Sequence, residues 1–282
     1  MIFKYFYATI LIPFIAVLEG KDGEPLPKKY EICVTELFIS PNLEPVMRPM
    51  VQNSFIGLIS LAEKFRPDLA VKLKKLNEEQ NIWTRLCELI LPGKCGKFSC
   101  LCHGDPRLNN IFIQKMDSAD NAQDHPEPGL RFIDFQLTRY GSPALDLQYL
   151  LNTGTDKKFR DQHLDSILDA YHNEFHSVLT KFPDVPLLQA KAVHGWTREK
   201  LKLDYDTGNM YGLLISLILL PVILLRPTDI DKSVSQQTVR EREHFFNDGR
   251  RELIFTVGSN NKLMRDRLFE LCDDMVAKKV IS

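Results

Sequence analysis

The sequence has few cysteines for its length, and they do not follow the dense spacing of a disulfide-rich scaffold. Six cysteines occur in 282 residues: Cys33, Cys87, Cys95, Cys100, Cys102 and Cys272. Small secreted domains that depend on disulfides contain a much higher proportion of cysteine. We therefore expect free thiols and a cytoplasmic protein.

An excess of charge of either sign is also missing. The 36 Lys and Arg residues nearly balance the 37 Asp and Glu residues, which leaves a formal net charge of -1. Proteins that bind nucleic acid or an anionic membrane surface usually concentrate basic residues on one face. The sequence therefore predicts no nucleic-acid partner, and it favours a small molecule or a protein as the ligand.

Long apolar runs are scarce. The run from Tyr211 to Leu225 is shorter than the roughly 20 residues that cross a bilayer, and it contains Pro221. It predicts a core helix that ends near the proline, and no membrane span. Residues 1–20 form the other apolar stretch. They predict a buried apolar helix, or alternatively a signal peptide at residues 1–18, in which case the protein would be secreted.

Helical periodicity dominates what is present. Apolar residues recur at intervals of three and four from Asn53 to Asn77, with a break at Pro67, and the pattern continues from Trp83 to Leu91. Further helices are predicted from Ser142 and Pro143 onward, around Leu164–Val178, and around Leu263–Leu271. Trp83 and Trp196 are expected to anchor the core, and Trp196 is also a candidate for lining an acceptor pocket.

Strand-like segments are confined to the middle of the chain. Three short strands are predicted at Phe98–His103, Ile111–Gln114 and Leu130–Phe135. The polar stretch at residues 115–129, between the last two, predicts an exposed loop. The fold class is therefore α+β, mostly helical, with a short β-hairpin.

Two segments next to these strands carry side chains that suit one chemistry. They read CHGDPRLNN at 102–110 and FIDFQ at 132–136. Phosphoryl transfer from ATP needs a carboxylate for the attacking hydroxyl and oxygen ligands that hold magnesium against the phosphates. Asp105 suits the first role, and Asn110 with Asp134 suits the second. His103 is expected beneath the loop, where its ring supports the loop through hydrogen bonds.

With the later segment YGSPALDL at 140–147, these motifs resemble the ecdysteroid kinase-like (CHK kinase-like) family, relatives of aminoglycoside and choline kinases. The resemblance implies ATP as co-substrate, Mg²⁺ as cofactor, and a hydroxyl of a small, steroid-like acceptor as substrate. It implies that Asp105 is the catalytic base and that Asn110 and Asp134 bind the metal and the nucleotide phosphates. His103 and Asp146 then support the catalytic loop, Asp146 through backbone hydrogen bonds.

The resemblance covers only the C-terminal lobe of a protein-kinase-like fold. It implies one lobe over residues 1–282, with a catalytic core at 98–151. A full member also has an N-terminal lobe that covers the ATP phosphates. We find no G-x-G-x-x-G or Walker motif, and Gly93–Lys97 lacks the glycine and the Ser or Thr that a Walker motif requires.

Two hypotheses follow from the lack of these N-terminal-lobe motifs. The first is an active kinase for a small alcohol. The second is a truncated, inactive pseudokinase that binds a ligand or a partner protein through its exposed lobe face; ATP and Mg²⁺ would then bind poorly or not at all. A third pattern, His172 and His176 at i and i+4, could present two metal ligands, but we expect a solvated helix face there.

Overall fold

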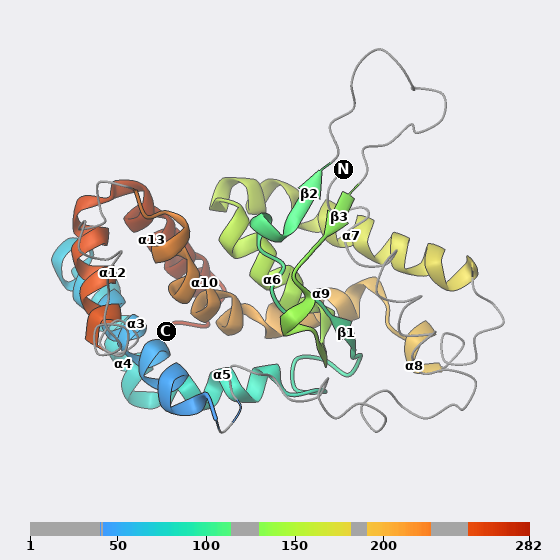
Figure 1. Cartoon of the computed structure of the whole chain (residues 1–282), viewed down its shortest axis with the longest axis horizontal. Helices are drawn as coiled ribbons and strands as arrows, with labels where there is room; N and C mark the ends of the chain where they lie inside the picture. Colours follow the sequence, from blue (N-terminus) through green and yellow to red (C-terminus); the bar gives the residue numbers. More distant parts are fainter. Residues whose placement is uncertain (1–39, 41, 114–129, 182–190, 227–247) are drawn as a thin grey trace, which may run out of the picture.

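We describe a computed structural model of the chain, which covers residues 40, 42–113, 130–181, 191–226 and 248–282. These residues form a mostly helical fold with two small two-stranded sheets (Figure 1). The predicted apolar helix or signal peptide at residues 1–20 and the predicted loop at 115–129 lie outside the described residues.

The helices cover most of the described chain. They are α3 (Glu44–Phe65), α4 (Pro67–Glu79), α5 (Ile82–Ile90), α6 (Pro143–Gly154), α7 (Lys157–Lys181), α8 (Lys191–His194), α9 (Arg198–Thr207), α10 (Asn209–Ile223), α12 (Asp248–Asn260) and α13 (Lys262–Ala277). The predicted break at Pro67 is confirmed, because Arg66 is non-helical and Pro67 begins a new helix. Proline suits that first position, where its missing N–H has no helical acceptor to lose.

The strands are β1 (Cys100–Cys102), β2 (Ile111–Ile113), β3 (Leu130–Phe132) and β4 (Arg139–Gly141). β2 and β3 form the predicted antiparallel hairpin, with Ile111 opposite Phe132. The three predicted strands are confirmed as β1, β2 and β3, but β4, which pairs antiparallel with β1, was not predicted. Three residues that include an arginine and a glycine give almost no strand signal by themselves, so only the pairing with β1 defines this strand.

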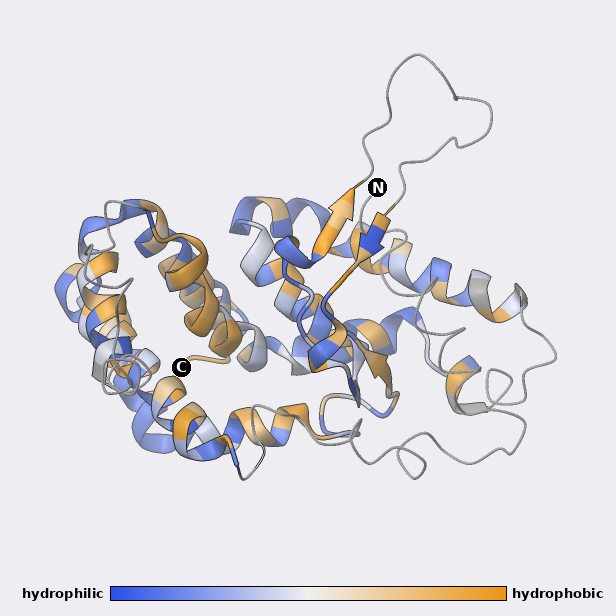
Figure 2. Ribbon diagram, in the orientation of Figure 1, coloured by the Kyte–Doolittle hydropathy of each residue, from blue (hydrophilic) through white to orange (hydrophobic). Residues whose placement is uncertain are grey.

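Two buried apolar clusters form the core. The first contains residues of α3, α4, α5, α10, α12 and α13, and the second contains residues of β1, α6, α7 and α9. In Figure 1 the first group of helices gathers on the left and the second on the right, with α6 and α10 between them. Figure 2 shows α10 as apolar on nearly all sides, which fits a helix packed against α6, α3 and α13.

The helix α10 continues through Pro221 and ends two residues later, near the predicted point. Proline lacks the N–H that would bond to the carbonyl of Leu217, four residues earlier. The buried guanidinium of Arg250 replaces it, since one Nη donates to the carbonyl oxygens of Leu217 (3.4 Å) and Ile218 (2.6 Å). A side chain of α12 thereby satisfies backbone oxygens of α10.

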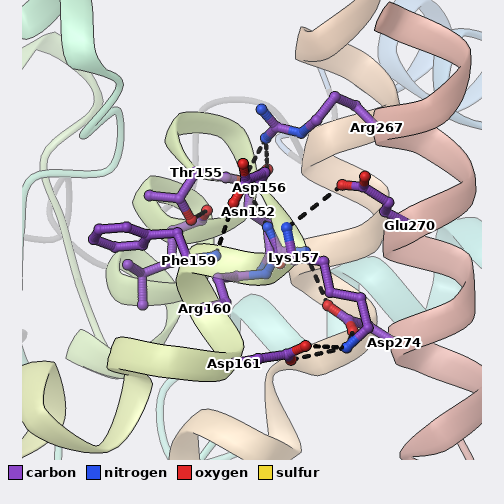
Figure 3. Close-up of polar contacts among 12 residues, drawn as sticks. Asn152, Thr155, Asp156, Lys157, Phe159, Arg160, Asp161, Arg267, Glu270 and Asp274 are labelled. Atoms are coloured by element: carbon purple, nitrogen blue, oxygen red, sulfur yellow. Dashed lines mark hydrogen bonds and ion pairs between the residues drawn. The ribbon is translucent and has the colours of Figure 1, made fainter.

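A charged network joins the two groups of helices where α6 meets α7 (Figure 3). Asp274 of α13 is buried and lies 2.8 Å from Arg160 and 2.9 Å from Lys157, both in the first turns of α7. Arg267 of α13 donates to the carbonyl of Asn152 in α6 at 3.2 Å. These contacts fix α13 against the end of α6, the helix that follows the motifs at 102–110 and 132–136.

No single helix in the described part of the chain is long and apolar enough to cross a membrane. The consecutive helices α9 and α10 have the length and apolar composition of a membrane span only when taken together, and the two are bent by 53° relative to each other.

Candidate active site

The loop that follows β1 turns sharply at Gly104. Its φ is +84°, and a Cβ placed there would lie 1.8 Å from the carbonyl oxygen of Leu137. Only glycine tolerates both the left-handed backbone and this close approach. Gly104 therefore lets the loop pack directly on the segment that follows Asp134.

Asp146, in the first turn of α6, holds this loop by its backbone. Its Oδ2 accepts a hydrogen bond from the amide of His103 at 2.7 Å, and its Oδ1 accepts one from Gly104 at 3.3 Å. The carboxylate is fully buried, with the guanidinium of Arg139 at 3.8 Å. A buried carboxylate with these partners is compensated in charge and in hydrogen bonds.

His103 connects the loop to the hairpin. Its Nδ1 accepts from the backbone amide of Asp105 at 3.3 Å, so its Nε2 carries the proton and donates to the carbonyl of Ile133 at 3.0 Å. The ring also packs on Phe135, with 4.7 Å between ring centroids. His103 thus spans the two motifs and is buried beneath the loop, away from solvent.

The structure brings Asp105 and Asn110 together. The Nδ2 of Asn110 donates to Oδ2 of Asp105 at 3.0 Å and to the Asp105 carbonyl at 2.9 Å. The hydroxyl of Tyr149 donates to Oδ1 of Asp105 at 2.5 Å. Both oxygens of this buried carboxylate are therefore held by neutral donors.

Tyr149 was not among the site residues predicted from the sequence. It lies three residues after Asp146, so both side chains lie on one face of α6, and that spacing could have identified it. Burial first, and then its contact with Asp105, raises the pKa of the Tyr149 hydroxyl well above its usual value. The hydroxyl therefore remains a protonated donor at any physiological pH.

Asp134 lies just after β3, in a left-handed backbone conformation with φ 66° and ψ 59°. Asp134 is joined to Asp105 through Arg107, which the sequence analysis also missed. The Nε of Arg107 is 3.3 Å from Oδ2 of Asp105, and its Nη2 is 3.9 Å from Oδ2 of Asp134. A left-handed non-glycine residue is uncommon, and at this position it turns the carboxylate toward the loop.

Asn110 and Asp134 are the side chains at this site that could offer oxygen ligands to a divalent cation. Among the described residues, no group of three or more His, Cys, Asp or Glu side chains could hold a metal alone. Mg²⁺ usually takes only one or two protein oxygen ligands and completes its shell with phosphate and water. Asn110 uses its Nδ2 on Asp105, which leaves its Oδ1 for a cation, and Asp134 is 30% exposed.

Residues 16–183 match the profile of the ecdysteroid kinase-like family. The chain belongs to this family. The matched region contains both motifs, the β2–β3 hairpin, α6 and α7, and therefore all the candidate site residues. Comparisons with curated proteins and with solved structures found no match.

In this ecdysteroid kinase-like chain, a cavity of about 200 Å³ adjoins Asp105. Asp105, Arg107 and Tyr149 line one part of it. The rest is mainly apolar and includes Val51, Trp83, Leu86, Ile215 and Leu219 from α3, α5 and α10. Trp83 thus lines the cavity, whereas Trp196 lies in the second apolar cluster, stacked on Phe98 at 4.5 Å between centroids.

The expected solvated face at His172 and His176 was wrong. Both rings are half-buried, their Nε2 atoms lie 3.1 Å apart, and the Nε2 of His172 is also 3.0 Å from the carbonyl oxygen of Trp196. The two histidines connect α7 to the segment before α9.

Proposed function

We propose that the chain transfers the γ-phosphoryl group of ATP to a hydroxyl of a small, mainly apolar molecule. The observation that supports this most strongly is the position of Asp105, which lies beside Arg107 and Tyr149 in the wall of a mainly apolar cavity. Such a cavity suits a ligand with an apolar body and one reacting polar group. In this proposal the described helices and hairpin are a kinase-like C-terminal lobe.

Each candidate residue has a role in the proposed reaction. Asp105 orients the hydroxyl and accepts its proton as the oxygen attacks the γ-phosphorus, while the bond to the bridging oxygen breaks and ADP leaves. Asn110 and Asp134 would hold Mg²⁺, which when bound neutralises phosphate charge. His103 and Asp146 keep the loop in place, as their contacts with its backbone suggest.

The apolar walls favour a steroid-like alcohol over a sugar or an aminoglycoside. A sugar would leave several hydroxyl groups facing residues such as Leu86 and Ile215 without hydrogen-bond partners, and each such group costs roughly 1–3 kcal/mol. An ecdysteroid is one member of the class we propose.

A direct test is to incubate the purified chain with Mg²⁺ and ATP and a panel of steroid, terpenoid and sugar alcohols, and to detect phosphorylated products by mass spectrometry. We expect product from an apolar alcohol, and a loss of about 100-fold or more in kcat with Asp105→Asn. No product from any apolar alcohol by a protein that binds Mg²⁺ and ATP would contradict the proposal.

One observation favours a second candidate function, binding of a protein partner without catalysis. Several large apolar side chains around the loop and hairpin are exposed: Leu108, Phe112, Ile113, Ile133 and Phe135. Phe112 is 58% exposed, which is unusual for an aromatic residue on a strand. If this second function is correct, the protein forms a stable complex with a partner through the hairpin, and Asp105→Asn leaves the affinity for that partner unchanged.

A further inference from the structure

Arg107 lies between the two acidic side chains of the candidate site. Its guanidinium contacts Oδ2 of Asp105 through Nε at 3.3 Å and approaches Oδ2 of Asp134 through Nη2 at 3.9 Å. The two carboxylates come from different segments, the loop after β1 and the segment just after β3. One cationic side chain therefore bridges the groups proposed as base and metal ligand.

The geometry of this bridge is poor for arginine. Well-formed arginine–carboxylate pairs are short and bidentate. Here Nε is buried but forms no hydrogen bond of good geometry with any described residue, although the side chain as a whole is 37% exposed. The other oxygen of Asp105, by contrast, is held at 2.5 Å by the buried hydroxyl of Tyr149. Asp105 thus has one firmly held oxygen and one whose arginine partner can leave.

Charge explains why arginine occupies this position. Two neighbouring carboxylates repel each other unless a positive charge lies near them. A divalent cation supplies more charge than a guanidinium, and the two cations repel each other when close, so both cannot occupy the space between the carboxylates. We propose that Arg107 is an internal counter-cation that neutralises Asp105 and Asp134 and is displaced when a divalent cation binds.

Displacement of Arg107 changes the contacts of Asp105, the proposed base. When Arg107 leaves, Oδ2 of Asp105 keeps its bond from Asn110 and gains one unoccupied lone pair on a residue that lines the cavity. Tyr149 continues to hold Oδ1, so the carboxylate does not rotate. Arrival of the cation therefore opens Asp105 to the acceptor hydroxyl. This consequence rests on the proposed function, whereas the displacement itself can be measured without any catalysis.

The test is a titration of Mn²⁺ alone into the full chain at low ionic strength, followed by calorimetry. We expect Arg107→Gln to bind Mn²⁺ about tenfold or more tightly than the wild type, because a repelling charge is gone. Arg131→Gln is the matched control. It removes the same charge from an exposed position on β3 and should change the affinity by less than about threefold, since exposed charges are screened. Asp134→Asn in the Arg107→Gln protein should abolish binding.

A second readout is thermal stability without any cation. Arg107→Gln should melt roughly 2–4 °C below the wild type. Added Mn²⁺ should raise its melting temperature back to that of the wild type. Mn²⁺ affinity in Arg107→Gln that is equal to or weaker than in the wild type, or binding by neither protein, would overturn the assignment. Tighter Mn²⁺ binding without phosphorylation of any alcohol would retain the role of Arg107 and reject the proposed kinase activity.

Discussion

At the scale of single residues, Gly104 is the position where the backbone itself limits substitution. Gly104→Ala should destabilise the protein by about 2 kcal/mol or more, because left-handed φ and a 1.8 Å approach to Leu137 both oppose a Cβ. Gly93→Ala is the matched control. Gly93 also has a positive φ, +78°, but a Cβ there meets nothing within 4 Å, so only the smaller backbone cost remains. Urea denaturation measures both variants, and an equal loss of unfolding free energy in Gly104→Ala and Gly93→Ala would contradict this interpretation.

His176 should make the stability of the protein depend on pH. Partial burial, and then the nearby His172 and His194, lower the pKa of its ring. The unfolded chain therefore takes up the proton first as the pH falls, and stability present above roughly pH 6.5 is lost below it.

His176→Gln should flatten the fall in the free energy of unfolding between about pH 7 and pH 5, measured in urea. His163→Gln, at an exposed position on the same helix, is the control variant. An unchanged fall in His176→Gln would show that other groups cause it.

At the scale of secondary-structure elements, the pair of Pro221 and Arg250 shows how one helix depends on another. Arg250→Leu should cost about 2–4 kcal/mol, since the carbonyl of Leu217 would be left without a partner. Adding Pro221→Ala should recover part of that loss by restoring the missing N–H. A double-mutant cycle from urea denaturation measures this coupling, and purely additive effects would contradict it.

The elements differ in how far the sequence could predict them. The helices around Pro67 and after Ser142 followed from apolar spacing and proline position, because those signals are local. The strand β4 did not, because its three residues become a strand only by pairing with β1, about 40 positions earlier. The hairpin was predictable, since β2 and β3 are short, apolar and separated by one polar stretch.

The residues of the candidate site also differ in how far the sequence could predict them. Asp105, Asn110 and Asp134 stood out as residue types suited to one chemistry and close in the sequence. Arg107 and Tyr149 did not, since their roles depend on where their side chains point in the folded chain. The cavity was not predictable from local patterns, because α3, α5 and α10 meet only after folding.

At the scale of the whole molecule, the charged network in Figure 3 connects the two halves of the core. Asp274→Ala should destabilise the protein by roughly 3 kcal/mol, because Arg160 remains buried without its carboxylate. The neighbouring Asp273→Ala is the matched control. Asp273 pairs with Arg66 near the surface, so its loss should cost about 1 kcal/mol or less. Equal losses for the two variants in thermal denaturation would contradict the proposed importance of the network.

The proposed function requires that the loop after β1 and the β2–β3 hairpin form one site for a cation and a nucleotide. Calorimetric titration of Mg²⁺ and ATP into the purified chain tests this most directly, with Asp134→Asn as the site variant and Asp165→Asn, an exposed aspartate on α7, as the control. We predict saturable binding by the wild type and by Asp165→Asn, and none by Asp134→Asn. Absence of binding by a folded wild-type chain, or equal binding by Asp134→Asn, would contradict the account.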